Sequence, residues 1–96
     1  MAAYIIADVD LKDAKAFEPY KQPTTDSVAQ YGGKFIVASS HHQVLEGKWN
    51  PKRLVVIEFP SAEAARRWYE SPEYRRVLPI RLQHAVSSML LVEGAS

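Results

Sequence analysis

The apolar residues of this chain switch repeatedly between the alternation typical of a strand and the three-to-four spacing typical of a helix. Residues 2–10 alternate, with Ile5 and Val9 on one face and Tyr4 on the other. Residues 34–39 and 52–59 are rich in β-branched and aromatic side chains, which favour strands. A last strand is predicted over 86–93, so that strands stand at both ends of the chain and in its middle.

A first helix is predicted between the first two strands. Asp13 is suited to cap it, and Gly32-Gly33 to end it, because a glycine readily adopts the left-handed conformation that follows a helix. Pro19 and Pro23 fall inside this segment, lack an N–H and crowd the preceding turn, so a kinked or split helix is expected. Its apolar positions are Phe17, Tyr20, Val28 and Tyr31.

A second helical region follows the third strand. Ser61 is a suitable N-cap, and Ser71-Pro72 is expected to stop the helix. A further helix is predicted over 73–85, with a bend at Pro79. The apolar stripe expected along it consists of Tyr74, Leu78, Leu82 and Ala85.

The resulting order, β-α-β-β-α-β, predicts a single ferredoxin-like α+β domain over residues 1–96. Its antiparallel sheet carries helices on one face only. The polar segment 40–50 is expected to be a loop, in which 43–46 extend as a ribbon. A bare apolar sheet face requires a cover, and a chain this short buries only about 65% of its unfolded surface. We therefore expect pairing with a second copy of the chain, as a homodimer.

Composition excludes several classes of protein. The chain has no cysteine, which excludes disulfides and thiolate chemistry. No apolar run approaches the roughly 20 residues needed to span a bilayer, and residues 1–8 lack the basic start of a signal peptide. A cytoplasmic protein without membrane contact is expected.

Nucleic-acid binding is also disfavoured, although the same element order builds RNA-recognition domains. The net charge is only +1, and acidic residues are mixed with the arginines of the second helical region. In an RNA-recognition domain the third strand should carry glycine, basic and exposed aromatic residues. Residues 53–59 of this chain contain an acid and no glycine.

Several blocks of the sequence together resemble one known family. They are Tyr31-Gly32-Gly33, Leu45-Glu46-Gly47-x-Trp49, Val56-Ile57-Glu58-Phe59-Pro60-Ser61 and Trp68-Tyr69-x-Ser71-Pro72-Glu73-Tyr74, with Arg53, Ala65 and Arg81. The chain is similar over nearly its whole length to the domain-of-unknown-function family numbered 1330. The resemblance implies a dimeric α+β barrel, in which two ferredoxin-like sheets pack face to face. It implies no reaction, since related barrels include cofactor-free monooxygenases, muconolactone isomerases and binding proteins. The chain departs from the family at Ser39-Ser40-His41-His42 and at Pro19.

Glu58 is the most informative polar residue, because it interrupts an apolar strand. A buried carboxylate needs a partner, and Arg53 and Arg81 are the candidates. A carboxylate in a half-buried pocket can also act as a general base, whereas the simpler interpretation is a structural ion pair. Asp8 is expected to share a face with Glu58, either as an acid–base pair or as the point where the first strand leaves the core.

The histidines provide weaker candidates. His41 and His42 are adjacent and point to opposite sides of an extended chain, and His84 is the only other histidine. No metal-ligand spacing is present, so no metal is expected. Either loop histidine is a candidate general base, although a surface position explains both equally well.

Three aromatic residues complete the candidate site. Trp68 and Tyr69 suit core or interface packing, and each is also a candidate ligand contact. Trp49, after Gly47, is a candidate for a pocket wall, for a cap on the barrel or for a clasp on the partner subunit.

Two functions remain open at this stage. One is a small-molecule enzyme that works without a cofactor and uses Glu58, Arg53 and a loop histidine, since no dinucleotide or metal motif is present. The alternative is a non-catalytic dimer that binds a small ligand or has a regulatory role. Convergence of these side chains on one pocket would favour chemistry.

Overall fold

The computed structural model describes residues 1–95 and contains four strands and three helices. The strands are β1 (Ala3–Leu11), β2 (Lys34–Ser39), β3 (Leu54–Phe59) and β4 (Ala85–Glu93). The helices are α1 (Ala14–Gln30), α2 (Ala62–Glu70) and α3 (Pro72–His84). The predicted ferredoxin-like α+β order is confirmed, with the second helical region divided at Ser71.

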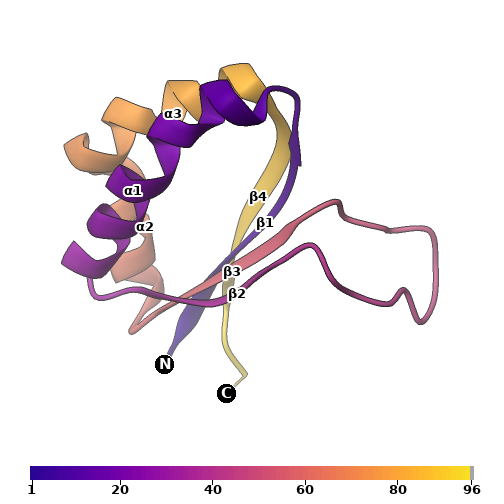
Figure 1. Cartoon of the computed structure of the whole chain (residues 1–96). Helices are drawn as coiled ribbons and strands as arrows, with labels where there is room; N and C mark the ends of the chain where they lie inside the picture. Colours follow the sequence, from indigo (N-terminus) through magenta and orange to yellow (C-terminus); the bar gives the residue numbers. More distant parts are fainter. Residues whose placement is uncertain (96) are drawn as a thin grey trace.

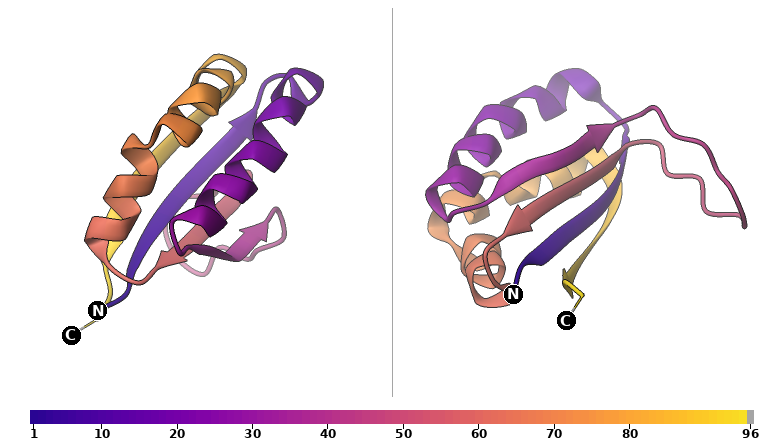
Figure 2. Two further views of the ribbon diagram at one scale, coloured as in Figure 1. Left: turned by 90° about the vertical axis from the view of Figure 1, so that its left-hand side faces the viewer. Right: turned by 90° about the horizontal axis from the view of Figure 1, so that it is seen from below.

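The strands form one antiparallel sheet in the order β2-β3-β1-β4. All three helices lie on one side of this sheet (Figures 1 and 2). Ile5 pairs with Ile57 on the helix-facing side, and both are buried. Tyr4 pairs with Glu58 on the opposite side, which no helix covers. We call that side the bare face.

Helix α1 begins and ends as the sequence predicts, but it is not split. The Asp13 carboxylate accepts a hydrogen bond of 3.0 Å from the Ala16 N–H, and Gly32 follows the helix with a φ of 84°. The helix continues through Pro19 and Pro23, so the expectation of a split helix is wrong. Both prolines are exposed, so the carbonyls that lose their N–H partners lie on the solvent side of the helix.

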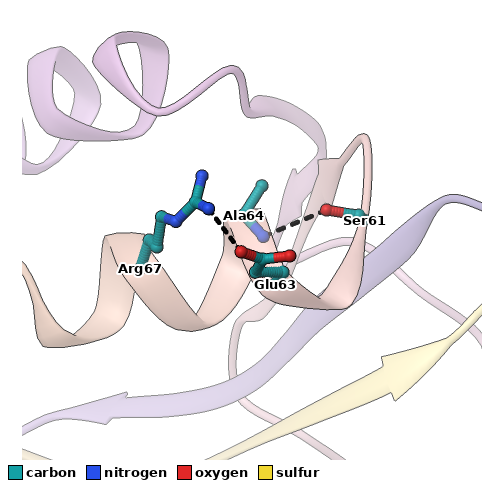
Figure 3. Close-up of polar contacts among 4 residues, drawn as sticks. All are labelled: Ser61, Glu63, Ala64 and Arg67. Atoms are coloured by element: carbon teal, nitrogen blue, oxygen red, sulfur yellow. Dashed lines mark hydrogen bonds and ion pairs between the residues drawn. The ribbon is translucent and has the colours of Figure 1, made fainter.

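Serine hydroxyls position α2 and α3. Ser61 accepts from the Ala64 N–H at 3.1 Å, and an exposed ion pair joins Glu63 to Arg67 one turn later (Figure 3). Ser71 ends α2 and caps α3 by accepting from the Tyr74 N–H at 3.1 Å.

The buried stripe of α3 shares Tyr74 and Leu78 with the prediction but differs in its other members, since Ala85 lies in β4. Leu82 was expected inside, but it is 64% exposed, whereas Arg81 is only 4% exposed. The buried positions are Tyr74, Val77, Leu78 and Arg81, which follow i, i+3, i+4 and i+7 spacing. The buried stripe therefore follows regular helical spacing, and its last member is the cation Arg81.

The connection between β2 and β3, residues 40–53, extends beyond the sheet as an arm (Figure 1). Residues 43–46 contain no strand, so the predicted ribbon is wrong. Leu45 at the end of the arm is 88% exposed. An isolated ribbon with no third strand or helix against it has little to stabilise it, which explains the irregular backbone. Within residues 1–95, no helix is long and apolar enough to cross a membrane.

Candidate functional site

A cavity of about 600 Å³ lies between the helix-facing side of the sheet and α1. Its volume falls in the range of small-molecule sites, roughly 300–1,000 Å³. The walls are largely apolar and aromatic, and their main members are Ala7, Val9, Phe17, Val55, Ile57 and Trp68. Such a cavity suits a ligand with an apolar or aromatic body.

The charged groups of this cavity are mostly cationic. Lys21, Lys52 and Arg53 line it and are exposed. The only acidic lining residue is Asp10, which lies 3.3 Å from the ammonium group of Lys12. The excess of positive charge favours the approach of an anionic molecule.

Arg81 provides a fourth cation, and unlike the others it is buried. Its Nε donates to the Tyr74 hydroxyl at 3.3 Å, and Nη1 donates to the Ser87 hydroxyl. The hydroxyls of Tyr74 and Tyr20 lie 2.6 Å apart in a buried hydrogen bond. Burial, with a smaller contribution from Tyr74, raises the pKa of Tyr20, which therefore stays protonated and neutral. The guanidinium is thus hydrogen-bonded to hydroxyl groups and to no carboxylate in residues 1–95.

Thr24 lies one turn after Tyr20 in α1 and lines the same cavity. Its hydroxyl has no hydrogen-bond partner and is the only buried side-chain polar atom in residues 1–95 of which this is true. Its neighbour Ser27 is fully satisfied, because it accepts from Trp68 Nε1 at 3.0 Å and donates to the Thr24 carbonyl at 2.8 Å.

Of the residues that the sequence singled out, Arg53, Trp68 and Arg81 line the cavity. Glu58 lies on the bare face instead, where it accepts from the Tyr4 hydroxyl at 3.1 Å and lies 3.5 Å from Lys34 Nζ. Neither arginine that the sequence suggested as its partner contacts it. Positions 53 and 58 have opposite parity, so their side chains point to opposite faces of the sheet.

Asp8 shares the bare face with Glu58, as the sequence predicts. Asp8 pairs with Leu54, however, four residues from Glu58, which places the two carboxylates about 13 Å apart along the strands. They are too far apart to act as an acid–base pair. Asp8 instead accepts a hydrogen bond of 3.1 Å from Trp49 Nε1 and so holds the arm against the sheet.

His41 and His42 both lie in the arm, and both are exposed. His42 is hydrogen-bonded to Asn50 at 2.8 Å, and neither histidine lines the cavity. Tyr69 lines a smaller hollow of about 310 Å³ beside β4, with Arg75 stacked on its ring. Residues 1–95 contain no group of three or more His, Cys, Asp or Glu side chains that could hold a metal ion.

The main residue that sequence analysis missed is Thr24. It completes a four-residue spacing between Tyr20 and Val28, so it interrupts an otherwise apolar helical stripe. A polar residue at such a position is a detectable signal of a cavity wall or of a buried hydrogen bond.

These features define a ferredoxin-like α+β protein with a cation-lined cavity between its sheet and its first helix. The chain belongs to the family described as Domain of unknown function (DUF1330), whose model matches residues 2–95. The resemblance stated from the sequence blocks is therefore confirmed. The comparison with curated proteins gives no match.

Solved structures share the fold at low sequence identity. A protein of unknown function from Rhodopseudomonas palustris has a TM-score of 0.78 and 20% identity, and the match covers 99% of this chain and 83% of that one. A dimeric ferredoxin-like protein of unknown function from Jannaschia sp. CCS1 has a TM-score of 0.77 and 8% identity, with 98% and 100% covered. SnoaB from Streptomyces nogalater, a cofactor-independent oxygenase, has a TM-score of 0.70 and 12% identity, with 99% and 94% covered.

Proposed function

We propose that the protein binds a small, largely apolar molecule in the cavity between the sheet and α1. The observation that carries this proposal is the cavity itself, with a volume of about 600 Å³ and walls that include Phe17 and Trp68. The cavity residues include no histidine, and the single carboxylate, Asp10, is paired with Lys12. General-base chemistry therefore has little support in this site, and ligand binding without catalysis is favoured.

A cavity-blocking substitution tests this proposal. Ala38 is exposed and lines the cavity at strand β2, so Ala38→Phe should obstruct it without disturbing the core. Ala29→Phe is the matched control, because Ala29 is exposed on α1 and does not line the cavity. Isothermal titration with the neutral compounds benzamide and 2-naphthamide should show binding that weakens about tenfold in Ala38→Phe only. Equal binding by both variants would place the ligand elsewhere.

A second candidate is a cofactor-free enzyme. SnoaB, a cofactor-independent oxygenase, shares this fold, and in this chain Arg81 and the tyrosine hydroxyls could stabilise negative charge that develops on a bound substrate. The two functions are separated by mass spectrometry of a bound compound after incubation in air. A compound recovered unchanged supports binding alone, whereas a protein-dependent product supports catalysis.

We also propose that two copies of the chain pair through the bare face. This face carries exposed apolar side chains, among them Val86, Leu90 and Val92, which are 62%, 56% and 41% exposed. Such a row is costly in water unless a partner covers it. The related fold from Jannaschia is described as dimeric, which supports the proposal.

Two leucines of similar exposure provide a matched test of pairing. Leu90 lies on the bare face and Leu82 on the outer side of α3, where it is 64% exposed. Light scattering at micromolar concentration should find a dimer for the wild type and for Leu82→Glu. Leu90→Glu should give a monomer, because it would bring two like charges into the interface. A dimer of Leu90→Glu would exclude this face as the contact.

A further inference from the structure

Arg81 carries a buried positive charge that the protein leaves without a negative partner. The residue is 4% exposed, and within residues 1–95 no carboxylate lies within ion-pair distance of it. A guanidinium keeps its proton in proteins, so burial does not neutralise it. Buried charges are normally paired, because an unpaired one loses its hydration without compensation.

The hydrogen bonds of Arg81 leave donors free. A guanidinium has five N–H donors, and those of Arg81 make one hydrogen bond to Tyr74 and one to Ser87. Nη2 donates to no group in the described part of the chain, and Arg81 lines the cavity. The second proton of Nη1 and those of Nη2 are therefore available for a bidentate contact with a ligand.

A second polar group in the same cavity also lacks a partner. Thr24 is 5% exposed, lines the cavity and has a hydroxyl with no hydrogen bond among residues 1–95. Tyr20 connects the two groups, because it lies one turn before Thr24 in α1 and is bonded to Tyr74, the partner of Arg81. Arg81, which has free donors, and Thr24 therefore line the same cavity, whose walls are largely apolar and aromatic.

We propose that Arg81 forms an anion subsite, with Thr24 beside it, and that the natural ligand is a monocarboxylate with an apolar or aromatic body. The inference rests on the proposed function and names the class of ligand. One guanidinium matches the planar geometry of a carboxylate, and a single buried cation compensates one negative charge. Lys21, Lys52 and Arg53, which are exposed, would attract the anion toward the cavity.

Paired probes of the same shape test the subsite. Isothermal titration of the wild type at neutral pH compares 2-naphthoate with 2-naphthamide, and benzoate with benzamide. Each carboxylate should bind about tenfold or more tightly than its amide, because a charge-assisted bidentate contact replaces a neutral one. Arg81→Gln should remove this preference and retain amide binding. Arg76→Gln is the matched control, since Arg76 is an exposed arginine of the same helix that does not line the cavity.

A measurement on the wild type keeps the test decisive if Arg81→Gln does not fold. The ¹⁵N resonance of Arg81 Nε–H should shift on addition of 2-naphthoate and remain nearly unchanged with 2-naphthamide. Equal affinity for carboxylates and amides, with no selective shift of this resonance, would overturn the anion subsite and leave the proposed function standing. If none of the four probes bound, both the proposed function and the subsite would be overturned.

Discussion

Thr24→Val should make the ligand-free protein more stable, although it removes a polar group from a helix. The Thr24 hydroxyl is buried and has no partner in residues 1–95, so folding strips it of water without replacing the hydrogen bonds. An unsatisfied buried polar group costs about 1–3 kcal/mol. Valine has nearly the same shape and a similar helix propensity, so the cavity wall and α1 should be preserved.

The expected gain in the free energy of unfolding is therefore about 1–2 kcal/mol, the lower part of that range, since some relaxation accompanies burial. For a domain of this size each kcal/mol raises Tm by about 4–8 °C. Denaturant titration and thermal unfolding both measure the change. All variants should be compared at one protein concentration, because association would make Tm depend on concentration.

The neighbouring Thr25 provides the matched control. It is exposed, and its hydroxyl donates to the Lys21 carbonyl at 3.1 Å. Thr25→Val should change the free energy of unfolding by less than about 0.5 kcal/mol, as is usual at a surface position. A Thr24→Val protein that is less stable than the wild type would refute the argument, because the hydroxyl would then have a favourable partner in solution.

Two further predictions concern the packing around Gly33 and the acid titration of Glu73. Gly33→Ala should destabilise the protein by about 1–3 kcal/mol in denaturant titration, because a Cβ there would lie 2.6 Å from the Phe59 ring and 2.9 Å from Val28. Tyr31→Phe should reduce the loss of Tm between about pH 6 and about pH 3. The pKa of Glu73 lies below its ordinary value, chiefly through its own backbone N–H and then through the Tyr31 hydroxyl, so its stabilisation is present above that ordinary value and lost as the pH falls.

Each of these has a distinguishing control. At Gly47 an added Cβ would meet nothing within 4 Å, but the φ of 84° is unfavourable for alanine, so Gly47→Ala should cost only about 1 kcal/mol. A larger loss there than at Gly33 would contradict the packing explanation. Gln30 also donates to Glu73, at 3.2 Å, so an unchanged acid response in Tyr31→Phe would assign the lowered pKa to the other contacts.

Local features of the fold could be derived from the chain because they depend on residues close together in sequence. Alternation over residues 2–10 determined which side chains of β1 share a face, and Ile5 and Tyr4 lie on opposite sides as predicted. Asp13 and Ser61 cap their helices as expected, because a cap needs only the backbone N–H groups two or three residues ahead. Ser71 ends α2 as expected and, in addition, caps α3.

The partners of the charged residues required the tertiary structure. Glu58 contacts Tyr4 and Lys34, which approach it only through strand register. The sequence alone suggested Arg53 for this role, although the opposite parity of positions 53 and 58 argued against it. Alternation determines the face on which a side chain lies, but not which strand lies beside it.

The cavity likewise depends on how α1 and α3 pack over the sheet. Tyr20 and Tyr74 are separated by 54 positions, and their hydrogen bond connects α1 to the buried Arg81. Sequence spacing places Arg81 on the inner stripe of α3 without indicating what surrounds it. The chain alone thus determined the element order and the faces of the strands, since both follow from local periodicity. Only the packing of distant elements decided that the buried Arg81 lines the same cavity as Thr24, whose hydroxyl has no partner in residues 1–95.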